Sequence, residues 1–350
     1  MGGAASERAG RCAGDPWIVV TTINPPTRAI ERIAGMCRRG WRAVVVGDLR
    51  TPDGWRAEGI DYLSVERQRQ EFGELADVLP YRHYARKNLG YLHALREGAS
   101  LILETDDDNI PYDSFGEALR PQVSGRLIRR AGWVNVYRQY SDATIWPRGL
   151  PLTAIHDPGD DAGRVEGASS PIQQYLADSD PDVDAIYRLV FPQNVTFARL
   201  GEAVVLEPHA WVPFNSQNTL FFPAAFPLLY LPCFVSFRMT DIWRSFVAQA
   251  ALWIHGHRLA FQDATVEQAR NAHDLMKDFE DEVIGYRRNA EIGALLERAM
   301  ADLAPAERAS MGDTARALWR ALATAGIVEE RELVAFERWL AAATAFVRAA

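Results

Sequence analysis

An α/β fold built on a parallel, Rossmann-type sheet and followed by a helical C-terminal extension is predicted by two features of the sequence. Short β-branched runs alternate with amphipathic, helix-length segments through the first third of the chain, and such alternation produces βαβ units. The last portion is rich in Ala, Glu, Arg and Leu with helical periodicity. We therefore expect a disordered lead-in at 1–15, an α/β domain at 16–273 and a helical extension at 274–350.

The first strand and helix follow from the local pattern. Residues 17–23, WIVVTTI, form a short β-branched apolar run that predicts a buried strand, and the prolines at 25 and 26 end it. In the helix that follows, four residues share one face at spacing i, i+3, i+4, i+7: Ile30, Ile33, Ala34 and Cys37. Gly40 lies where a helix of this length would stop.

Three further strands and one helix complete this part of the predicted sheet. The runs at 42–47, 60–64 and 100–104 are short and apolar, and TPDG at 51–54 is typical of a turn. A helix is predicted over 84–95 from its apolar spacing. The strand at 100–104 leads directly into the acidic run TDDDN.

The middle of the chain is less regular. Residues 132–137, GWVNVY, predict a strand, and the Gly, Asp and Ser residues of 157–170 predict a loop. The apolar stretch 220–237 is nearly long enough to span a bilayer, but it contains three prolines. Because each proline breaks a helical hydrogen bond, we expect a buried irregular segment there and no integral membrane segment.

Composition limits the function classes. A net charge of −8 makes binding to nucleic acid through phosphate neutralisation unfavourable. The three cysteines are scattered with no CxxC pair, which argues against a disulfide framework and a thiolate zinc site. The cysteines therefore fit a reducing, cytoplasmic setting, and the N-terminus does not show the apolar core of a signal peptide.

Polar residues follow three of the predicted strands. These segments are Thr21–Asn24, Gly47–Asp48 and Asp106–Asp108. In an open parallel sheet, ligands bind at the carboxyl ends of the strands, where all three segments would meet. The sequence therefore predicts a ligand site at this edge.

The chemistry of that site follows from what the sequence lacks and what it supplies. There is no glycine-rich phosphate loop. Asp106, Asp107 and Asp108 could instead hold Mn²⁺ or Mg²⁺, which bind through one or two carboxylates and substrate phosphates. A cation would relieve the repulsion among three adjacent acids. The alternative is a solvated acidic loop.

A basic set lies upstream of the acidic run, at Arg82, His83, Arg86 and Lys87. Arg86 or Lys87 could contact a diphosphate at the start of its helix. The alternative is a solvated basic face.

Long blocks of this sequence resemble the STELLO glycosyltransferase family, and the resemblance covers roughly residues 16–275. The matching blocks include WIVVTTINPPT, VVVGDLRTP, LPYRHYARKNLGYLHAL, ETDDDN, IWPRGLPL, PIQQYLADSDPDVDAIYRL, PFNSQNTLF, residues 235–253 and RNAH. The resemblance implies a GT-A-like fold that binds a nucleotide sugar. The plant members are Golgi membrane proteins implicated in cellulose synthesis, whereas this sequence has no evident anchor.

The resemblance also implies roles for residues of the strand ends. Asp106 and Asp108 would be the metal and diphosphate ligands, with Asp107 beside them in the nucleotide-sugar site. Thr21, Asn24 and Asp48 would hold the nucleoside. Asp48 could accept a hydrogen bond from a ribose hydroxyl or a base edge.

Three residues nearer the C-terminus receive roles from the same resemblance. Asp241 would lie near the acceptor and could act as general base, with Thr240 capping its helix. The alternative for Asp241 is favourable charge at a helix start. His273 would be a third metal ligand or phosphate contact, or else a surface histidine.

Two arginines complete the candidate site. Arg238 and Arg244 could bind the leaving diphosphate or an acidic sugar through bidentate hydrogen bonds. They could equally pair with a cluster of acids on the segment 171–189: Asp180, Asp182 and Asp184. That cluster could also cap a helix.

The function that the resemblance implies is transfer of a sugar from a nucleotide-sugar donor to a glycan or another hydroxyl acceptor. Two alternatives remain open. A nucleotide-sugar mutase would share the metal site but need no acceptor, and a non-catalytic scaffold would retain the fold without binding nucleotides.

Overall fold

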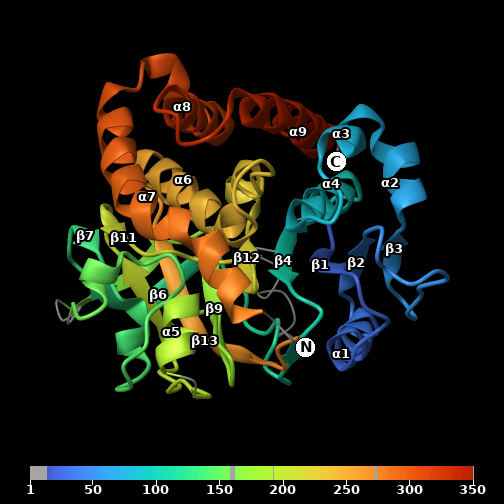
Figure 1. Ribbon diagram of the computed structural model, residues 1–350, viewed down its shortest axis with the longest axis horizontal. Helices are drawn as coiled ribbons and strands as arrows, with labels where there is room; N and C mark the ends of the chain where they lie inside the picture. The colour runs from blue at the N-terminus through green and yellow to red at the C-terminus, as the bar shows by residue number, and fades with distance from the viewer. Residues whose placement is uncertain (1–13, 158–161, 192, 272–273, 350) are drawn as a thin grey trace, which may run out of the picture.

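The computed structural model describes residues 14–157, 162–191, 193–271 and 274–349. One large mixed sheet forms the centre of the molecule, and helices pack against it (Figure 1). Its strand order is β3-β2-β1-β4-β12-β9-β13-β10-β6-β8, with β5 paired to β13. The predicted α/β fold with a helical C-terminal part is confirmed.

Four parallel strands form one half of the sheet. They are β1 (Pro16–Thr22), β2 (Arg42–Gly47), β3 (Asp61–Leu63) and β4 (Leu101–Thr105). β1 lies between β2 and β4, parallel to both, and β3 extends the half beyond β2. The predicted strands agree with these bounds to within one residue at each end. The Ile and Val residues of β1 and β2 are buried on both faces, as expected in a parallel sheet.

Helices connect these strands. They are α1 (Arg28–Cys37), α2 (Val65–Phe72), α3 (Glu74–Val78) and α4 (Lys87–Arg96), with the 3₁₀ turn η1 (Tyr84–Arg86) before α4. The Thr27 side chain caps α1, and Gly40 follows it with a positive φ, as predicted for a helix stop. α4 approaches the sheet so closely that a Cβ at Gly90 would lie 2.6 Å from Val19. This close contact fixes α4 over β1 and β2.

The other half of the sheet is mixed. Its strands are β5 (Asn109–Pro111), β6 (Gln122–Ile128), β8 (Ala162–Ser169), β9 (Ile172–Asp178), β10 (Ala203–Leu206), β12 (Asn218–Phe221) and β13 (Leu259–Gln268). β12 runs antiparallel to both β4 and β9 and so joins the two halves. The helix α5 (Ala185–Val190) follows β9, with Asp184 as its cap.

Two predictions for the middle of the chain are wrong. The predicted strand at 132–137 is only the two-residue β7 (Gly132–Trp133), which pairs with β11 (Ala210–Trp211) and leads to the 3₁₀ turn η2 (Val136–Gln139). The predicted loop at 157–170 contains β8, paired to β6 at the edge of the sheet. An edge strand can carry Gly and charged residues because one side of it has no neighbouring strand.

The proline-containing stretch 220–237 is a buried irregular segment, as predicted. It leaves β12 and passes through η4 (Pro223–Leu228) to η5 (Phe237–Met239), which leads into α6 (Thr240–Ile254). Across the described residues, the structure has no helix with the length and apolar character needed to cross a membrane. Thr240 is the first residue of α6 and does not cap it through its side chain, so that prediction is wrong, but Asp241 does lie in the first turn.

The C-terminal helices α7 (Leu275–Asp302), α8 (Met311–Thr324) and α9 (Glu330–Ala349) pack on the sheet helices. The turns η3 (Leu152–Ala154) and η6 (Pro305–Arg308) lie elsewhere in the loops. α7 and α8 contact α6, and α9 contacts α4 (Figure 1). Leu296, Leu318 and Trp339 belong to the same buried cluster as Trp17 and Val19 of β1. The extension therefore shares one hydrophobic core with the sheet.

Candidate active site

A cavity of about 680 Å³ opens at the carboxyl ends of β1, β2 and β4. All three predicted ligand segments line it, including Thr21, Asn24, Asp48 and the Asp106–Asp108 run. The convergence predicted from the strand ends is therefore confirmed. The opposite wall comes from the loop before β12, the start of α6 and the end of β13.

Asp106 is held by a buried cation. The ammonium of Lys87 is fully buried, and it donates to Asp106 Oδ1 at 3.0 Å and to the Thr105 carbonyl at 2.8 Å. Tyr84 also donates to Asp106 Oδ1, at 2.6 Å. One carboxylate oxygen of Asp106 is thus engaged by the protein, while Oδ2 receives no hydrogen bond from the described residues.

Asp107 ties the acidic run to the first strand. Its Oδ2 accepts from the Thr22 hydroxyl and, at 3.0 Å, from Asn24 Nδ2. The Thr27 hydroxyl donates to the Asp107 carbonyl. These contacts occupy Asn24, a predicted nucleoside ligand, and fix the distance between the ends of β1 and β4.

Asp108 has the least favourable environment of the three acids. Burial, reinforced by the neighbouring charges of Asp106 and Asp107, raises its pKa from 3.8 to about 7. Its donors are long: Gln268 Nε2 and the Asn271 amide each lie 3.3 Å from Oδ2. Among the described residues, no cationic side chain forms an ion pair with the Asp108 carboxylate.

Asp48 and the predicted diphosphate contacts are engaged by the protein. Asp48 Oδ1 accepts from the Leu49 amide at 2.6 Å, and Oδ2 accepts from the His83 amide at 3.2 Å. The guanidinium of Arg86 is buried and donates to Gln68 Oε1 and two backbone carbonyls. Arg86 lines the cavity but its guanidinium is bonded to the protein, and Lys87 is buried against Asp106, so their contact with a diphosphate stays a prediction.

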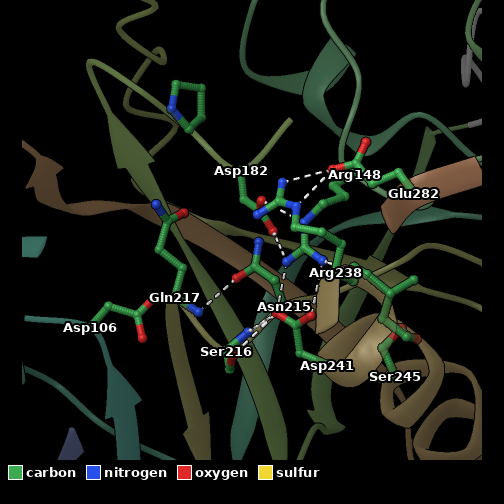
Figure 2. Close-up of polar contacts among 12 residues, drawn as sticks. Asp106, Arg148, Asp182, Asn215, Ser216, Gln217, Arg238, Asp241, Ser245 and Glu282 are labelled. Atoms are coloured by element: carbon green, nitrogen blue, oxygen red, sulfur yellow. Dashed lines mark hydrogen bonds and ion pairs between the residues drawn. The ribbon is translucent and has the colours of Figure 1, made fainter. Parts of the chain in front are cut away.

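On the far wall, Arg148 joins two acids (Figure 2). Its guanidinium donates to both oxygens of Asp182 at 2.8 Å, and to Asp241 Oδ1 at 3.0 Å and Oδ2 at 2.9 Å. The Ser216 amide and hydroxyl donate to Asp241 Oδ2 at 3.1 Å. All four residues line the cavity. Sequence reasoning gave Arg148 and Ser216 no role, because their partners lie 34 to 93 positions away for Arg148 and 25 for Ser216.

The same contacts weaken Asp241 as a base. Although burial opposes its charge, Arg148 and the Ser216 amide lower the pKa of Asp241 from 3.8 to about 2. A carboxylate of that pKa accepts a proton poorly near neutral pH. The role of Asp241 as general base remains a prediction, and its environment favours a positioning role on this wall.

We expect Asp241→Asn to flatten the acid dependence of stability. Because the pKa of Asp241 is lowered in the folded protein, its contribution is present above its ordinary value of 3.8 and lost as pH falls through about 2. Thermal unfolding across this range should show a shallower pH slope in the variant. The exposed Asp53→Asn is the control, and identical slopes for Asp241→Asn and the parent protein would contradict the proposed pairing with Arg148.

The two predicted arginines take different positions. Arg238 lines the cavity, and its Nε donates to Glu282 Oε1 at 2.8 Å. Arg244 is fully buried and donates to Glu104 Oε1 at 2.5 Å and Oε2 at 2.8 Å. It is not among the cavity-lining residues, so a sugar or diphosphate contact by Arg244 is not supported. Neither arginine forms an ion pair with the acidic cluster of the segment 171–189. Arg238 pairs with Glu282 and Arg244 with Glu104.

Asn271 and Arg270 lie beside the acidic run. Asn271 donates to Asp108 through its amide and side chain, and Arg270 lines the cavity. His273 itself lies outside the described residues. Within the described ranges, no group of three His, Cys, Asp or Glu side chains is arranged to hold a metal ion.

Known proteins similar to this chain point to one family. A family model described as STELLO glycosyltransferases matches residues 238–341. Probable glycosyltransferase STELLO2 of Arabidopsis thaliana is 31% identical over 275 residues, covering 73% of this chain and 36% of the plant protein. Probable glycosyltransferase STELLO1 of the same plant is 30% identical over 276 residues, with 73% and 35% covered. The chain thus spans about a third of the length of these relatives.

Two solved structures are remotely similar. A mycobacterial protein has a TM-score of 0.38 at 12% identity, with 83% of this chain and 76% of that chain covered. The glucosyl-3-phosphoglycerate synthase of M. tuberculosis has a TM-score of 0.36 at 11% identity, with 83% and 82% covered. The fold described above rests on the strand order of this chain and not on these likenesses.

Proposed function

Because this chain belongs to the STELLO glycosyltransferase family, we propose that it transfers a sugar from a nucleotide-diphosphate donor to a hydroxyl group of a glycan or another acceptor. The observation that carries the proposal is the position of Asp106–Asp108. They lie at the carboxyl end of a parallel strand, in a cavity large enough for a nucleotide sugar. Fold alone would not support the activity, since one fold hosts many functions.

Mn²⁺ or Mg²⁺ fits this site when the donor supplies further ligands. Among the described residues, one oxygen of Asp106 has no donor, and Asp108 is buried beside two further acids, an arrangement that a cation would stabilise. Such ions are commonly held by one or two carboxylates plus phosphate oxygens, so two acids and a diphosphate form a suitable set. When bound, the ion would stabilise negative charge on the departing diphosphate. His273 remains a candidate additional ligand.

The protein's own residues would perform the remaining tasks. Thr21, Asn24 and Asp48 line the part of the cavity beside β1 and β2, which suits the nucleoside. Asp182, Asp241 and Ser216 lie on the opposite wall, where their oxygens could orient acceptor hydroxyl groups. The Arg148 bridge holds both carboxylates in place, so that their oxygens could accept hydrogen bonds from a polyol.

A thermal-shift screen of nucleoside diphosphates and nucleotide sugars, with and without Mn²⁺, tests the proposal. A ligand that binds only the folded protein raises its melting temperature. At a concentration of 100 times its Kd, it adds about 2.7 kcal/mol to the free energy of unfolding. We expect stabilisation by one nucleotide class that requires the metal ion. A well-folded sample that responds to none of them would favour a scaffold without nucleotide binding.

A further inference from the structure

We propose that Arg82 binds the diphosphate of the donor and is held in place for that contact by a strained backbone. The inference rests on the proposed function, because it names a specific contact for the same donor. Arg82 lies on the segment between α3 and η1 and lines the cavity. It was part of the basic set seen in the sequence, but no role followed for it there.

The charges around the cavity single out few available cations. Three adjacent acids line one side, so a diphosphate needs positive groups there. Arg148, Arg238 and Arg270 are each paired with carboxylates. Arg86 is bonded to Gln68 and backbone carbonyls.

Burial also lowers the pKa of His83 to about 4, which leaves its imidazole neutral at physiological pH. Among the described lining residues, Arg50 and Arg82 are then the arginines with no carboxylate or carbonyl partner. Both are exposed. They are the cations free to meet a diphosphate.

The backbone distinguishes Arg82 from Arg50. Arg82 has a φ of +55°, in the left-handed region that non-glycine residues rarely adopt. Such a conformation persists only where the surrounding structure imposes it, and it is concentrated at functional sites. A glycine would satisfy this backbone without strain, but the position carries a long cationic side chain.

The contacts that impose this conformation come from the site itself. The His83 amide donates to Asp48 Oδ2 at 3.2 Å, and the His83 ring accepts from the Ala85 amide at 3.1 Å. Tyr84 then donates to Asp106. The residues directly after Arg82 are therefore fixed to the ends of β2 and β4, which presents the Arg82 guanidinium to the cavity.

The test uses three variants: Arg82→Ala, Arg82→Gly and, as a matched control, Arg56→Gly. Arg56 is exposed, does not line the cavity and has an ordinary negative φ, so its variant removes the same charge without the strained backbone. Isothermal titration with UDP and GDP in the presence of Mn²⁺ gives affinity. Thermal unfolding without ligand gives stability.

Loss of a charge-assisted contact should raise the Kd of the nucleotide on the order of 10-fold to 100-fold in both Arg82 variants. In a parallel titration with uridine, which lacks the diphosphate, the rise in Kd should be smaller than with UDP. Arg82→Gly should melt roughly 1–3 °C above Arg82→Ala, because glycine relieves the left-handed strain. Arg56→Gly should bind as the parent protein does and melt no higher. If Arg82 had only a structural role, Arg82→Gly would not bind the nucleotide more weakly than the parent protein while melting above Arg82→Ala.

Unchanged nucleotide affinity in Arg82→Ala would overturn the inference, as would an equal loss for uridine and UDP. If the parent protein binds neither nucleotide and the thermal-shift screen finds no other, the proposed function fails, and inorganic pyrophosphate becomes the probe. Pyrophosphate binding that weakens in Arg82→Ala but not in Arg56→Gly would then still support Arg82 as a diphosphate ligand. Pyrophosphate binding that is equal in all variants, or absent, would reject it.

Discussion

Asp108→Asn is expected to abolish metal-dependent nucleotide binding while raising the stability of the free protein. The Asp108 carboxyl has a pKa raised to about 7 by burial and by its acidic neighbours. An acid whose pKa is raised on folding destabilises the folded state wherever it is ionised, so a neutral amide removes that cost. The same substitution removes a proposed metal ligand.

Asp106→Asn should also lose binding but should lower stability. Its carboxylate accepts from the fully buried Lys87 ammonium, and removing one partner of a buried ion pair leaves the other uncompensated. Two neighbouring substitutions therefore share the binding defect and differ in the sign of their effect on stability.

Thermal unfolding with and without UDP or GDP and Mn²⁺ measures both effects. The control is Asp113→Asn, because that side chain is 95% exposed and lies outside the cavity. Retained metal-dependent binding in both Asp106→Asn and Asp108→Asn would remove the basis for a metal site at this acidic run. A destabilised Asp108→Asn would contradict the account of its pKa.

Arg244→Met should be the most destabilising single change in the interior. Arg244 and Glu104 are both fully buried, and their side chains form two hydrogen bonds in the core between α6 and β4. Losing one member of such a pair typically costs about 3–5 kcal/mol, because the other charge stays buried without a partner. The Tyr91 hydroxyl also donates to Glu104, but a neutral donor does not replace a guanidinium.

Urea unfolding of Arg244→Met and of the double variant Arg244→Met/Glu104→Gln measures this coupling. The double variant should recover part of the lost stability, since no unpaired charge remains. A loss below about 1 kcal/mol in Arg244→Met would show that water or a rearranged neighbour compensates Glu104. Because Arg244 lies outside the cavity, nucleotide affinity in the folded variant should stay unchanged.

The parallel half of the sheet could be predicted closely because its signals are local. Residues 17–23 and 42–47 are β-branched runs bounded by proline and glycine, and each matches a strand of the structure. Thr27 and Gly40 stand at the ends of the intervening helix. The edge strand β8 could not be predicted, because its sequence lacks the apolar pattern that marks buried strands. It is a strand because it pairs with β6, a contact distant in sequence.

The sequence by itself determined the order of strands and helices in the first third, the place where their polar ends meet, and the resemblance to one family. It also placed Asp106–Asp108 at that meeting point. These properties follow from neighbouring residues, whose spacing fixes secondary structure and whose strand ends converge in any parallel sheet.

Only the tertiary structure decided which charges around the cavity are available. Lys87 and Arg86 looked like ligands for phosphate, but they are buried and bonded to groups of the protein, whereas Arg82 is exposed on the cavity wall. Arg148, far from its partners in sequence, fixes the acids of the far wall. Charge pairing depends on distances of a few ångströms between residues that may be far apart along the chain, and local pattern carries no information about those distances.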